Sequence, residues 1–138
     1  MKGEKKTMFT KTVTYEDYKG NTRTEDFYFN LNKAELVELE LSTKGGLTVM
    51  MDRIIATQDN PTLFKIFKDL VAKSYGILSD DGRKFIKNQE VLDDFMQTEA
   101  YSIIFSELAT NEEAAAEFFN NVIPQNLAKE LSEEEANK

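Results

Sequence analysis

The chain has 138 residues, a formal charge of −8, no Cys and no His. The missing residue types exclude disulfides, thiolate zinc sites, a cysteine nucleophile and a histidine base, and the acidic balance argues against nonspecific binding of nucleic acid, which needs a basic face. No apolar run reaches the roughly 20 residues of a membrane span, and none follows the charged first residues as it would in a signal peptide.

The first regular element that we expect is a β-hairpin. Residues 1–6 are interpreted as a flexible lead. Two runs of alternating apolar and polar residues, 7–15 and 22–31, flank turn-forming residues at 17–21. This pattern predicts a hairpin over residues 7–31. Because an isolated two-stranded hairpin is only marginally stable, its apolar face must pack on helices or on another copy of the protein.

Three aromatic residues in the second run are candidates for contacts with other molecules. Phe27 and Phe29 fall on one face of the strand and Tyr28 on the other, because side chains alternate along a strand. Packing both phenylalanines inward leaves Tyr28 exposed. We therefore assign all three residues to self-association or partner binding.

The pattern changes from strand to helix at Asn32. Its side chain can accept hydrogen bonds from the backbone amides of the first helical turn. The side chain of Glu35 can in turn accept a hydrogen bond from the Asn32 amide, as in a capping box. Leu31 and Leu36 stand where a hydrophobic staple needs them. The helix is expected to end at the glycine pair 45–46, where a left-handed backbone costs little.

Helical spacing of apolar residues predicts further helices up to residue 124. Pro61 suits the first turn of one of them, because proline is common at that position. Asn88 and Thr98 are expected to cap two later helices. Thr110, with Glu113 three positions on, predicts another capping box.

A second, smaller hairpin is also expected between the helices. Residues 77–78 and 85–86 can pair around a tight turn. The overall fold class that we expect is α+β and mainly α, an N-terminal β-hairpin followed by a five- or six-helix bundle over residues 32–124.

Two pairs of adjacent large residues, Met50-Met51 and Phe118-Phe119, lie on predicted helices. Helix neighbours point about 100° apart, so both members of a pair face the core only in a wide apolar stripe. That stripe is the simpler interpretation. The alternative is that one member faces outward, and methionine-rich surfaces suit adaptable recognition of partners. We therefore add all four to the candidate residues for partner binding or self-association.

The end of the chain is acidic. From residue 111 onward there are seven glutamates and two lysines. Within residues 125–138 only Leu127 and Leu131 are large and apolar, so we expect a tail that is disordered or forms a short helix. A single domain is expected over residues 7–124.

No residue stands in a recognised catalytic, cofactor or metal motif. Residues 80–81 lack the alternating oxygen ligands of a calcium loop, whereas the acidic pairs 93–94 and 112–113 fall in helices, where neighbours diverge. The glycine pair 45–46 lacks the residue order of a phosphate-binding loop. We therefore expect no catalytic residue, no cofactor, no bound metal and no enzymatic activity.

Several stretches carry a resemblance to a known family. Residues 14–46, 73–76, 81–86 and 97–101 are similar, in order and spacing, to the tail assembly chaperones of long-tailed, siphovirus-type phages or prophages of Gram-positive bacteria. The resemblance extends from about residue 8 to residue 124. None of these motifs is catalytic.

The resemblance implies a specific role. A protein of this family would coat the tape measure protein, keep it soluble and recruit major tail protein during assembly of the tail tube. It would act in the cytoplasm of the host bacterium and be absent from the mature virion. Self-association as a homo-oligomer, in a ring or open spiral, is expected from the residues themselves, because a lone hairpin carries more aromatic surface than a domain of this size readily hides. The acidic balance and the lack of a long apolar run lead us to expect no binding of nucleic acid or membrane.

Two other classes of protein are compatible with the residues alone. An acidic helical inhibitor that mimics DNA would need carboxylates spread over one face, whereas the excess acid here lies at one end. A small enzyme would need a pocket with convergent polar groups, and no motif in the sequence indicates residues for such a pocket. A tape measure gene immediately downstream would separate these classes.

Overall fold

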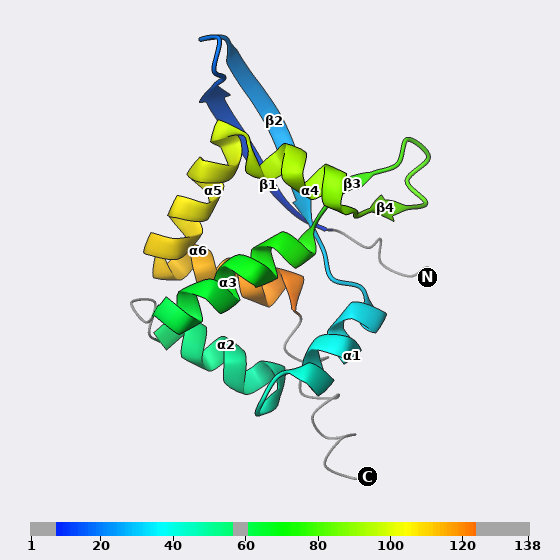
Figure 1. Cartoon of the computed structure of the whole chain (residues 1–138), viewed down its shortest axis with the longest axis vertical. Helices are drawn as coiled ribbons and strands as arrows, with labels where there is room; N and C mark the ends of the chain where they lie inside the picture. Colours follow the sequence, from blue (N-terminus) through cyan, green and yellow to red (C-terminus); the bar gives the residue numbers. More distant parts are fainter. Residues whose placement is uncertain (1–7, 57–60, 124–138) are drawn as a thin grey trace, which may run out of the picture.

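The computed structural model describes residues 8–56 and 61–123. Within these ranges the chain forms four strands and six helices (Figure 1). In chain order they are β1 (Phe9–Glu16), β2 (Thr22–Phe29), α1 (Lys33–Ser42), α2 (Gly46–Ala56), α3 (Pro61–Ser74), β3 (Tyr75–Leu78), β4 (Phe85–Ile86), α4 (Gln89–Met96), α5 (Glu99–Thr110) and α6 (Glu112–Val122).

The strands form one antiparallel sheet in the order β1-β2-β3-β4. The predicted architecture, an N-terminal hairpin followed by a helical bundle, is therefore wrong, because β3 and β4 lie between α3 and α4 in the chain and extend the sheet. Two residue pairs, Tyr28 with Gly76 and Phe29 with Tyr75, join β2 to β3. Residues so far apart in the chain leave no local sequence pattern that predicts their pairing. In the sequence, Gly76 is typical of the end of a helix rather than of a strand.

The smaller hairpin has the predicted pairing. Ile77 pairs with Ile86 and Leu78 with Phe85. Its turn is closed by Ser79, which donates from its hydroxyl to Asp81 Oδ1 at 2.8 Å and from its amide to the carbonyl of residue 84 at 2.9 Å. The predicted hairpin is thus confirmed, but as part of a four-stranded sheet.

Helices cover one face of the sheet. Helices α5 and α6 contact β1, and α4 contacts β3. Because paired residues share a face, the register places Val13, Phe27 and Phe29 together on the helix side, and all three are buried. The opposite face is exposed and rich in threonine; it carries Thr10, Thr12, Thr14, Thr22 and Thr24.

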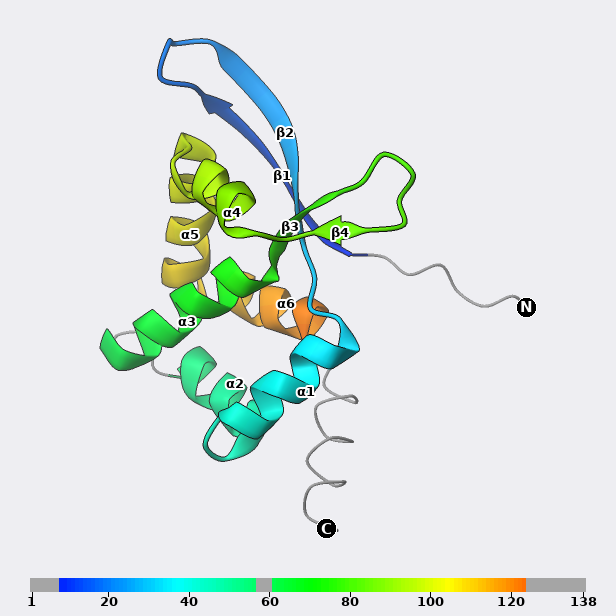
Figure 2. The same ribbon diagram turned by 45° about the vertical axis from the view of Figure 1, so that its right-hand side comes forward.

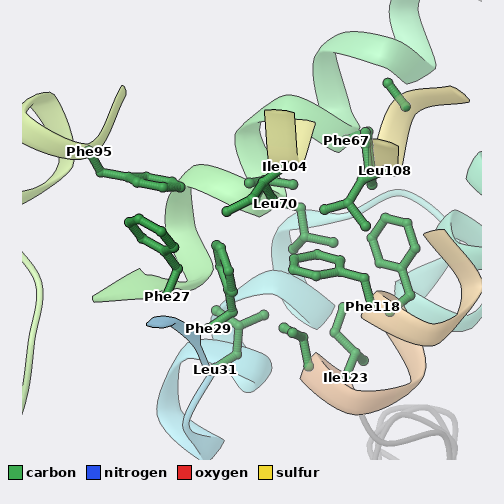
Figure 3. Packing of buried hydrophobic residues seen from close by; sticks show 14 of the residues in the cluster. Phe27, Phe29, Leu31, Phe67, Leu70, Phe95, Ile104, Leu108, Phe118 and Ile123 are labelled. Atoms are coloured by element: carbon green, nitrogen blue, oxygen red, sulfur yellow. The ribbon is translucent and has the colours of Figure 1, made fainter. Parts of the chain in front are cut away.

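Phe29 lies at the centre of the core, where its side chain is fully buried (Figure 3). Phe118 from α6 meets it edge to face, with ring centroids 5.6 Å apart. Phe95 from α4 lies 6.0 Å from it and 5.4 Å from Phe27. These aromatic contacts join the sheet to helices at both ends of its covered face.

The strand-to-helix junction forms as predicted. Asn32 Oδ1 accepts from the Glu35 amide and Glu35 Oε1 accepts from the Asn32 amide, both at 2.9 Å. The predicted caps Asn88 and Thr98 are also confirmed. The cap predicted at Thr110 is wrong, because Thr110 is the last residue of α5 and the next residue, Asn111, caps α6 instead.

Replacing Asn32 with Ala is expected to lower the free energy of unfolding by about 0.5–2 kcal/mol, because the first turn of α1 loses its cap. Urea denaturation followed by circular dichroism measures the change. Glu38→Ala is the matched control, since Glu38 is exposed on the same helix. Equal midpoints for Asn32→Ala and the unmodified protein would contradict the capping role.

Candidate interaction surfaces

Most of the predicted contact residues lie in the core. Phe29, Phe118 and Phe119 have no exposed area, and Phe27 and Met50 retain 8% and 7%. Phe118 and Phe119 are therefore both accommodated in one wide apolar stripe. A partner could reach these five side chains only if the core opened.

The two remaining candidates for contact with other molecules are Met51 and Tyr28. The side chain of Met51 lies outside the described residues. Tyr28 is half-buried on the uncovered face of the sheet, opposite Gly76 of β3. Among the six predicted residues whose side chains are described, Tyr28 is the one that reaches the surface.

The β3–β4 arm, residues 75–86, projects beside Tyr28. In Figures 1 and 2 its turn points away from the helices. Leu78 and Phe85 lie on the Tyr28 side of the sheet by register, and Leu78 is 41% exposed. Gly76 is required here, because a Cβ atom at this position would lie 2.8 Å from Phe85 Cε2. The ring of Phe85 thus packs directly on the backbone of β3.

Lys87 fixes the base of this arm to the start of α1. Its Nζ donates to the carbonyl of Asn30 at 2.7 Å and to both carboxylate oxygens of Glu35 at 2.9 Å. It also lies 5.6 Å from the centroid of the Phe85 ring. No local pattern marks Lys87, because its partners lie more than fifty residues away in the chain.

A groove lies between α1, α2 and α3. Its volume is about 330 Å³, and it continues into a smaller hollow of about 90 Å³ that shares Leu39, Ser42 and Lys73 with it. The lining of the larger part combines apolar and charged residues: Leu39, Ser42, Thr43, Lys44, Met50, Asp69, Leu70 and Lys73. We call this the α1–α2–α3 groove.

The corner between α1 and α2 shapes one end of the groove. Glu40 is 4% exposed, and its Oε1 accepts from the Leu47 amide at 2.9 Å. Gly46 has a φ of +82°, and a Cβ atom there would lie 2.6 Å from Glu40 Oε2. The carboxylate therefore holds the first turn of α2, and Gly46 provides the room for it.

A third surface lies at the tip of the β1–β2 hairpin. The Tyr15 hydroxyl donates to Glu25 Oε1 at 2.6 Å, and this hydrogen bond raises the pKa of Tyr15 to about 12. Arg23 Nε donates to Asp17 Oδ2 at 2.7 Å and holds the pKa of that carboxyl below its usual value. Tyr18, beside this network, is 76% exposed. The tip thus combines an ordered polar network with an exposed aromatic ring.

Within residues 8–56 and 61–123, no three or more Asp or Glu side chains are grouped so that they could hold a metal ion. None of the helices described in these ranges is long and apolar enough to cross a membrane. The surfaces described above present apolar side chains beside charged ones, which is the chemistry of protein–protein contact.

Residues 8–138 match the model of a family described as phage tail assembly chaperone. No curated protein and no solved structure was found to match the chain.

Proposed function

Because the chain belongs to a phage tail assembly chaperone family, we propose that it binds the tape measure protein and recruits major tail protein while the tail tube is built. The observation that carries this proposal is the extent of the match, from residue 8 to residue 138. We propose further that the phage or prophage is of the siphovirus type with a Gram-positive host. The protein acts, on this view, in the host cytoplasm without catalysis and is absent from the mature virion.

The surface chemistry supports binding of a long helical partner. Helical partners dock in grooves, and the α1–α2–α3 groove offers the half-buried Leu39 beside the exposed Lys44 and Lys73, with the buried Met50 and Leu70 beneath. The formal charge of −8 keeps a complex between such a partner and many copies of this chain soluble, because like-charged complexes repel one another.

Several copies of the chain must act together in this proposal, because one small protein covers only a short part of a long partner. Head-to-tail contacts between identical copies generate rings or open spirals, and either form can surround a long molecule. The seven predicted residues stay in the proposal as self-association or partner contacts, and among the six whose side chains are described Tyr28 is the one that can be tested in the folded state.

Co-expression with the tape measure protein of the same phage tests the proposed function. We expect the tape measure protein to remain soluble and to co-purify with the chain, whereas it aggregates when expressed alone. An unrelated acidic protein of similar size is the control. Equal solubility of the tape measure protein with either acidic protein, without co-purification, would refute the proposal.

Tyr28→Glu is expected to weaken self-association, because it replaces a half-buried aromatic side chain on the uncovered face of the sheet with a charge that a contact would bury. Light scattering over a wide range of protein concentration measures the effect. Thr24→Glu is the matched control, since Thr24 lies on the same face and is exposed. If both variants associate as the unmodified protein does, Tyr28 is not a contact residue.

A further inference from the structure

We draw no further inference here: the strongest candidate, the outer edge of β1, which pairs with no further strand within residues 8–56 and 61–123, carries no proposal because nothing in the structure shows what covers it.

Discussion

Replacing Phe29 with Ala is expected to lower the free energy of unfolding by about 3–5 kcal/mol, the range for removing a buried aromatic ring. Phe29 is fully buried, and four rings lie within 5.6 to 6.3 Å of its own, those of Phe9, Tyr75, Phe95 and Phe118. These rings come from β1, β3, α4 and α6, so the cavity would open where several elements meet.

Guanidinium denaturation measures this loss, with Tyr18→Ala as the control. Tyr18 is 76% exposed at the hairpin tip, and its removal should change the free energy of unfolding by no more than about 0.5 kcal/mol. Similar losses for the two variants would contradict the central position of Phe29 in the core.

Gly46→Ala is expected to lower the free energy of unfolding by about 2–4 kcal/mol. The left-handed backbone at this residue costs a non-glycine residue about 1–2 kcal/mol. The new Cβ would also lie 2.6 Å from Glu40 Oε2, and displacing that carboxylate breaks its hydrogen bond with the Leu47 amide at the start of α2.

Gly20→Ala isolates the second contribution. Gly20 has a φ of +87°, close to that of Gly46, but a Cβ atom there would meet nothing within 4 Å. The difference between the two variants in denaturant midpoint therefore reports the clash with Glu40. Equal losses would show that the carboxylate moves away freely and does not hold α2.

Local features could be predicted from the sequence because their partners lie within a few residues. The capping box at Asn32 and Glu35 depends on a spacing of three, and it is present. The register of 77–78 with 85–86 follows from a short turn. The sequence pattern predicts the cap of α6 one residue too early, because Thr110 and Asn111 can both cap a helix and only the packed helices decide between them.

Features built from distant residues could not be predicted in this way. The link from β2 to β3 and the Lys87 contacts with Asn30 and Glu35 join segments whose proximity depends on the whole fold. The α1–α2–α3 groove has the same origin, because three helices supply its lining. Among the residues that line this groove, only Met50 is a contact candidate on the sequence alone, as one member of an adjacent apolar pair.

The number of chains bound per tape measure protein tests the central claim most directly. Complexes with tape measure fragments of increasing length can be purified and weighed by light scattering coupled to size-exclusion chromatography. If the chain coats its partner, the number of bound copies rises in proportion to fragment length. A fixed number of copies at every length, or no stable complex, would contradict the proposed chaperone role.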